Sequence, residues 1–140
     1  MILLDTSGLL AALDASERHH PAAVAVLRGS GANKLLSPFV LAELDYLLAE
    51  RVNRRSASAL LGEVAAGAYT LEPFGAADVA AASAIIARYE DLNIGLADAS
   101  IVVLANRHDV RDVLTLDERH FRALRDDRGR SFRLLPTDAA

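Results

Sequence analysis

The chain has 140 residues, which fits one compact domain, and its formal net charge is −4 at pH 7. Hydrophobic residues make up 52% of it, but the longest apolar stretches, such as residues 101–105, are much too short to span a bilayer. The absence of cysteine excludes disulfides, thiolate metal sites and cysteine nucleophiles. Because no basic leader precedes Asp5, we expect no signal peptide. The lack of cysteine favours a reducing cytoplasm, and the short apolar stretches favour a protein without membrane contact.

The first half of the chain alternates short apolar runs with amphipathic stretches. We expect, in order, a strand at 2–4, a helix that begins at Thr6 or Ser7, a helix over 21–27 and a strand at 35–36. Ser37 and Pro38 then provide a cap and a proline at the first helical position. The helix that follows carries its apolar face on Val40, Leu44 and Leu48.

The second half continues the same alternation. We expect helices over 56–66, 78–88 and 96–106, and strands over 69–74, 113–116 and 132–135. Strands that alternate with helices indicate an α/β fold with a mainly parallel sheet. The sequence contains no repeat or linker, so we expect a single domain over 1–136 and a frayed tail at 137–140.

Four acidic residues stand at unusual places in this pattern. Asp5 ends the first strand, and Asp117 directly follows the strand at 113–116. Glu43 lies in the second turn of the helix after Pro38, and Asp98 opens an almost wholly apolar helix. Ligands of parallel α/β sheets bind outside the carboxyl ends of the strands, where the helices begin. All four carboxylates are therefore expected to converge at that edge.

Each acid taken alone has an ordinary alternative. Asp5 and Asp98 are also suited to capping a helix or opposing its dipole, Glu43 to a solvated helix face, and Asp117 to opening a turn. The joint interpretation is stronger because two of them lie in apolar surroundings, where an unpaired charge is costly. Carboxylates that converge in a partly dry cleft repel one another and require a cation.

Oxygen ligands alone favour Mg²⁺ or Mn²⁺ over zinc. Such a site suits the hydrolysis of phosphodiesters, because the cation holds the phosphate and lowers the pKa of water. Thr6, Ser7 and Thr115 lie next to these acids in the sequence and are candidates for orienting water or a carboxylate. Capping or packing is the alternative role for each of them.

The motifs around these acids resemble those of PIN-domain nucleases, and more narrowly VapC toxins of bacterial toxin–antitoxin pairs. They are Asp5-Thr6-Ser7, Ala42-Glu43-Leu44, Gly95-Leu96-Ala97-Asp98-Ala99 and Leu114-Thr115-Leu116-Asp117, with Phe121 after them. The resemblance spans the chain in the family's order and spacing. It implies that Asp5, Glu43 and Asp98 are the core acidic residues of a metal-dependent endoribonuclease, and that Asp117 is a fourth, more variable one.

The resemblance also implies a three-layer α/β/α sandwich, a homodimer, and a VapB-type antitoxin whose tail covers the active site. It implies RNA as the substrate, in a structured loop of tRNA or ribosomal RNA. The acidic total does not exclude RNA, because four metal-binding acids would leave 15 acids to balance the 15 basic residues.

Arg119 and Arg122 follow Asp117 at near-helical spacing and are candidates for contacting phosphates beside the metal. A solvated basic face is the alternative for this pair. Arg51 belongs to a second, weaker candidate rim at a helix end, and the histidines, including His120 near the site, are interpreted as surface residues.

Four other function classes are weighed against this interpretation. A PIN nuclease of RNA processing would carry the same site, although the small size favours a toxin. An α/β phosphatase of the haloacid-dehalogenase type needs a second acid where Ser7 stands, and a receiver domain needs a late lysine, which the lone Lys34 does not provide. A structural interaction module would leave the four acids unexplained.

Overall fold

A computed structural model describes residues 1–31 and 33–139 of the chain. The elements are, in chain order, β1 (Ile2–Leu4), α1 (Thr6–Leu13), α2 (His20–Gly29), β2 (Lys34–Leu36), α3 (Pro38–Arg51), α4 (Arg54–Ala65), β3 (Thr70–Leu71), α5 (Ala76–Arg88), the 3-10 helix η1 (Glu90–Leu92), α6 (Leu96–His108), β4 (Asp112–Leu114), α7 (Glu118–Phe121) and β5 (Arg133–Leu135).

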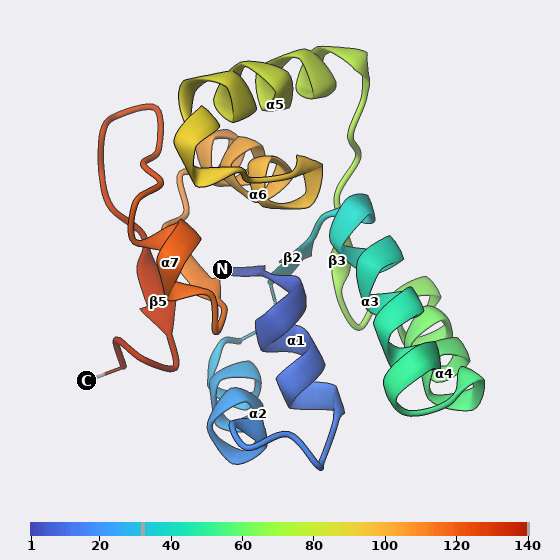
Figure 1. The fold of residues 1–140 in the computed structure, drawn as a ribbon. Coiled ribbons are helices and arrows are strands. Elements are labelled where there is room, and N and C mark those ends of the chain that lie inside the picture. The colour runs from blue at the N-terminus through green and yellow to red at the C-terminus, as the bar shows by residue number, and fades with distance from the viewer. Residues whose placement is uncertain (32, 140) are drawn as a thin grey trace.

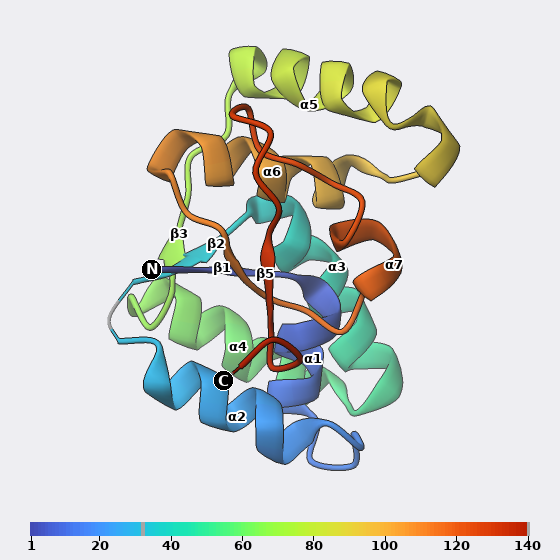
Figure 2. The ribbon, with the colours of Figure 1, turned by 90° about the vertical axis from the view of Figure 1, so that its left-hand side faces the viewer.

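Within the described residues, five strands form one sheet in the order β3-β2-β1-β4-β5, and every neighbouring pair is parallel. Figures 1 and 2 show α5 and α6 on one side of this sheet and α1 and α2 on the other. Helix α3 packs beside α1 and α6, and α4 packs against α3. The expected α/β/α sandwich with a parallel sheet is confirmed.

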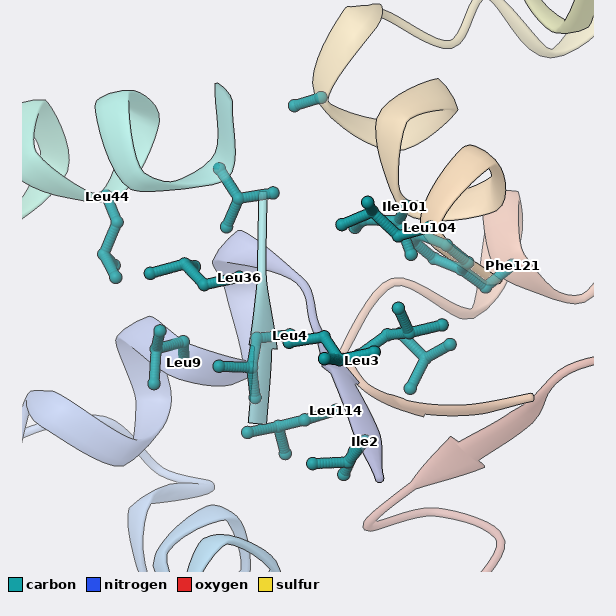
Figure 3. Close-up of a cluster of buried hydrophobic side chains, with 14 of the residues drawn as sticks. Ile2, Leu3, Leu4, Leu9, Leu36, Leu44, Ile101, Leu104, Leu114 and Phe121 are labelled. Atoms are coloured by element: carbon teal, nitrogen blue, oxygen red, sulfur yellow. The ribbon is translucent and has the colours of Figure 1, made fainter. Parts of the chain in front are cut away.

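The core lies between the central strands and the helices that cover them. Both faces of a parallel sheet are buried, which explains why its strands are continuous apolar runs rather than alternating ones. Figure 3 shows Leu3, Leu4, Leu36 and Leu114 of the strands among side chains contributed by the helices, namely Leu9, Leu44, Ile101, Leu104 and Phe121. Helix α6 is buried over most of its length because it packs between α5 and the sheet.

Some boundaries differ from those that the sequence pattern predicts. The strand expected over 69–74 is reduced to Thr70–Leu71, at the edge of the sheet, and Pro73 has no N–H to extend it. Helix α4 begins earlier than expected, at Arg54, because the side chain of Asn53 accepts a hydrogen bond from the Ser56 N–H at 2.7 Å.

The contact between β1 and β4 determines where the strand ends lie. Leu4 is in register with Leu114, and the Asp5 N–H donates to the Leu114 carbonyl at 3.0 Å. Helix α1 starts directly over this pair, and a Cβ on Gly8 would lie only 2.4 Å from the Leu114 oxygen. Glycine is therefore required for α1 to approach β4 this closely, which brings residues 5–7 beside residues 115–117.

No helix in the part of the chain that the structure describes is both long and apolar enough to cross a bilayer. Of the tail expected at 137–140, Ala140 lies outside the described residues. Within the rest, Asp138 accepts hydrogen bonds from the Leu134 N–H at 2.8 Å and from the Arg122 guanidinium at 2.7 Å. The C-terminal segment is thus attached to both β5 and the end of α7.

Candidate active site

The four acids singled out in the sequence line one cleft of about 360 Å³ at the carboxyl ends of β1 and β4. Its wall also includes the hydroxyl residues Thr6 and Ser7, and three further polar residues: Glu17, Arg51 and His120. A larger hollow of about 650 Å³ lies between α2 and β5, but its walls are mostly apolar and contain none of the four acids. The chemistry is therefore assigned to the smaller cleft.

Asp5 is held in place by two hydroxyl groups. Its Oδ2 accepts hydrogen bonds from Thr115 Oγ1 at 2.6 Å and from Ser7 Oγ at 2.9 Å. Its side chain makes no capping bond to α1, which rules out the simple cap interpretation. Burial, together with the charge of Asp98, raises the pKa of Asp5 to about 6, although the two hydroxyl donors oppose that rise.

The hydroxyl groups are themselves fixed by the backbone after β4. Ser7 Oγ accepts from the Leu116 N–H at 2.9 Å, and Thr115 Oγ1 accepts from the Asp117 N–H at 2.9 Å. A change in the register of β1 against β4 would therefore disturb Asp5 and the segment that carries Asp117 together.

Glu43 reaches the cleft from α3. Thr6 Oγ1, at the start of α1, donates to Glu43 Oε1 at 2.7 Å. The start of α3 is fixed by Ser37, whose Oγ accepts from the Phe39 N–H and lies 2.7 Å from Ser100 Oγ of α6. This buried pair of hydroxyls connects the helix of Glu43 to the helix of Asp98.

Asp98 lies in the first turn of α6, and its side chain is 20% exposed. Burial raises its pKa, as do the charges of Asp117 and Glu43, whereas His120 opposes the rise. Two of the four acids therefore resist ionisation in the folded chain. This is expected where carboxylates converge without a cation.

Asp117 has two roles at the start of α7. Its Oδ1 caps the helix by accepting from the His120 N–H at 3.0 Å, so the turn-opening role is real. Its Oδ2 lies 2.8 Å from His120 Nδ1, and Asp98 Oδ2 lies 3.4 Å from the same nitrogen. Nδ1 is buried and has no partner in hydrogen-bond geometry among the described residues, because neither oxygen lies in a suitable direction.

Comparison with known proteins decides the family. The sequence model of the PIN-domain family matches residues 2–126 of this chain. The chain belongs to the PIN-domain family. Ribonuclease VapC26 of Mycobacterium tuberculosis is 46% identical over 96% of this chain and 100% of its own length, which puts this PIN domain among the VapC ribonucleases. The fold matches that of the M. tuberculosis toxin VapC20, with a TM-score of 0.78 at 21% identity over 84% of this chain and 90% of that one.

The donors in the PIN domain's cleft fit a divalent cation. Carboxylate oxygens are the ligands that Mg²⁺ and Mn²⁺ prefer. Asp98, Asp117 and His120 each offer one atom, and these three atoms lie within 4.8 Å of one another. The buried, unpartnered nitrogen and the raised pKa values are both relieved by a positive ion at this place.

The structure brings together all seven residues that the sequence suggested for the acidic site. The two arginines of the suggested rim lie outside the cleft, Arg119 on α7 and Arg122 directly after it. Arg122 is paired with Asp138 at 2.7 Å and with Glu118 at 3.1 Å, and this pairing raises its pKa. Arg119 is exposed and has no ion-pair partner in residues 1–31 and 33–139.

Two residues were undervalued by the sequence analysis. His120 is not an ordinary surface histidine, because its Nδ1 is buried between two of the acids. The signal was its position three residues after Asp117, which puts both on one side of a helical turn. Arg51 lines the cleft because it follows Glu43 by eight residues, and this spacing puts both on one face of α3.

Proposed function

We propose that this PIN domain is an endoribonuclease toxin that hydrolyses phosphodiester bonds in a structured RNA loop with the help of Mg²⁺ or Mn²⁺. The observation that carries the proposal is the convergence of four carboxylates, from four separate segments of the chain, in one cleft. Such a cluster is electrostatically unfavourable unless it binds a cation. The close sequence relation to a VapC ribonuclease supports RNA as the substrate.

Most polar residues at the cleft have a role in this proposal. Asp5, Glu43, Asp98 and Asp117 would hold the cation, which supplies positive charge to the phosphate and lowers the pKa of water. Thr115 and Ser7 keep the Asp5 carboxylate in one orientation, and Thr6 does the same for Glu43. Arg51 adds a positive charge to the cleft wall, where a phosphate would approach.

The first test is cleavage of structured RNA by the purified protein. VapC20 is described as a toxin that cleaves the sarcin–ricin loop, so that loop and a tRNA anticodon stem-loop are suitable substrates. We expect discrete cleavage products with Mg²⁺ or Mn²⁺ and none with EDTA. Cleavage that persists in EDTA would contradict the role of the cation. Turnover of a phosphomonoester but not of RNA would favour the phosphatase alternative.

A second candidate function is RNA processing by the same site. Growth arrest on expression separates the two, because a toxin stops growth and a processing enzyme does not.

If the protein is a toxin, we further propose that a VapB-type antitoxin inhibits it, with a segment that brings an arginine or lysine to the acidic cleft. Release of growth arrest by the co-expressed antitoxin tests this. We also propose that the protein is a cytoplasmic homodimer with a single domain over 1–136. Light scattering would test the dimer, and limited proteolysis would test the single domain.

Arg119 is expected to contact the RNA backbone, because it is exposed beside the cleft and its charge is not used within the described part of the protein. Replacing Arg119 with glutamine should weaken RNA binding. The slope of the logarithm of the affinity against the logarithm of the salt concentration should also become less steep, by about 0.7 for one lost contact to a single strand. Fluorescence anisotropy between low and moderate salt, with Ca²⁺ or EDTA to prevent cleavage, measures both effects.

Arg122→Gln is the matched comparison. The sequence suggests the same role for it, but its guanidinium already binds Asp138 and Glu118, so the change in slope should be much smaller than for Arg119. If neither variant alters the slope, α7 is a solvated basic face and the phosphates are bound elsewhere.

A further inference from the structure

The cleft divides into two halves with different donors. In one half, Asp5 and Glu43 are each held by hydroxyl groups. In the other half, Asp98 and Asp117 face the imidazole of His120. We propose that His120 Nδ1 is a metal ligand together with Asp98 and Asp117, so that this half of the cleft binds Mn²⁺ and later transition-metal ions in preference to Mg²⁺. The inference rests on the metal-dependent function proposed above.

The distances suit a shared cation. His120 Nδ1 is 2.8 Å from Asp117 Oδ2 and 3.4 Å from Asp98 Oδ2. Two ligands at right angles on a cation with bonds of about 2.1 Å lie about 3.0 Å apart, and a tetrahedral pair lies slightly further apart. The three atoms come from α6, from α7 and from the residue that caps α7, so both helices must be in place before the set is complete.

The direction of Nδ1 distinguishes a ligand from a hydrogen-bond donor. If the imidazole were present to donate a proton to Asp117, the carboxylate oxygen at 2.8 Å would lie along the N–H direction. It does not, and Nδ1 has no partner in hydrogen-bond geometry in the described residues. A buried nitrogen without a partner is costly. A cation between the nitrogen and the two oxygens would remove that cost.

The backbone that carries the imidazole is also held in place before any ion binds. The backbone N–H of His120 donates to Asp117 Oδ1, and the next residue, Phe121, is completely buried against Phe132. The four-residue helix α7 is therefore fixed at both its first turn and its core contact. A preformed ligand set of this kind loses little conformational freedom when a metal binds.

A nitrogen donor changes which ions the site favours. Carboxylate oxygens suit Mg²⁺ and Mn²⁺, whereas imidazole strengthens the binding of Mn²⁺, Co²⁺ and the ions after them more than that of Mg²⁺. The affinity of the wild-type cleft for Mn²⁺ and Co²⁺ relative to Mg²⁺ should therefore depend on His120.

The experiment combines spectroscopy with binding. Protein labelled with ¹⁵N-histidine is loaded with Mn²⁺, and pulsed electron paramagnetic resonance records any coupling between the ion and nitrogen. We expect a ¹⁵N coupling in the wild type and in His19→Gln, whose histidine is exposed and does not line the cleft. The coupling should be absent in His120→Gln. Absence of the coupling in the wild type overturns the inference without any variant, and its loss in His120→Gln but not in His19→Gln assigns it to His120.

Titration calorimetry then compares Mn²⁺, Co²⁺ and Mg²⁺. His120→Gln should lose about tenfold or more in affinity for Mn²⁺ and Co²⁺, and less than about threefold for Mg²⁺. Absence of nitrogen coupling in the wild type overturns the inference. So does a rise in affinity for all three ions in His120→Gln, which would identify the imidazole as a competing positive charge.

The same titrations separate this inference from the proposed function. If Asp98→Asn loses cation binding while His120→Gln binds as the wild type does, only the role of His120 is overturned. If the wild-type protein binds no divalent cation, the metal-dependent function is overturned as well.

Discussion

Asp98→Asn is expected to reduce the rate of RNA cleavage by about 10³-fold or more, which corresponds to about 4 kcal/mol of lost transition-state stabilisation. The asparagine keeps the shape of the side chain but removes a charge that the cation requires. Folding should be intact, because the carboxylate that is lost is itself destabilised by burial and by Asp117 and Glu43. Single-turnover cleavage of a labelled stem-loop, at saturating Mg²⁺ and separately at saturating Mn²⁺, measures the effect.

Asp45→Asn is the matched control for this loss. Asp45 is two residues from Glu43 on α3, but it forms an ion pair with Arg54 instead of lining the cleft. Its variant should cleave RNA at the wild-type rate. Equal rates for Asp98→Asn and Asp45→Asn would remove Asp98 from the metal-binding set, and a loss in both would mean that the assay reports folding.

The position of the acids was predictable from the sequence because it depends on topology alone. Asp5 and Asp117 follow apolar runs, and adjacent parallel strands put their carboxyl ends at the same edge. Asp98 and Glu43 lie on helices with buried or amphipathic faces. Those faces fix which side of each helix is turned toward the sheet. These arguments need only the order of elements, which a one-residue error in a boundary leaves unchanged.

The pairing of hydroxyls with acids was not predictable, because it depends on the register. Thr115 reaches Asp5 only because Leu4 is opposite Leu114, and Gly8 allows α1 to lie close over that pair. The pairing of Arg122 with Asp138 was equally hidden. It exists because β5 returns the chain to the end of α7, sixteen residues later in the sequence.

Helix α7 was missed as an element for a related reason. A helix of four residues has no intrinsic stability, and hydrophobic periodicity cannot detect it. It is held by the Asp117 cap and by Phe121, which packs edge-on against Phe132. The orientation of His120 follows from those tertiary contacts, so a histidine that appears solvated in the sequence lies between two acids in the fold.

The metal-free protein is expected to lose stability as the pH rises from about 4 to about 6. Asp5 has a pKa of about 6 in the folded chain because it is buried and lies near Asp98. In the unfolded chain its pKa is about 4. Between these values the native state binds more protons than the unfolded state, so the free energy of unfolding falls with increasing pH. The difference of about two pKa units corresponds to about 3 kcal/mol at neutral pH.

Urea unfolding in EDTA at pH 4.5 and pH 7.5 measures this loss, with Asp5→Asn as the comparison. Other carboxylates titrate too, so the informative quantity is the stability of Asp5→Asn minus that of the wild type, which should grow by about 2 kcal/mol between the two pH values, because part of the loss is already present at pH 4.5. Mn²⁺ at about 100 times its dissociation constant should restore about 2.7 kcal/mol to the wild type, or roughly 10 °C in Tm, and much less to the variant. A difference that does not change with pH would mean that Asp5 ionises in the cleft as it does in the unfolded chain. In that case the cleft would not penalise its charge.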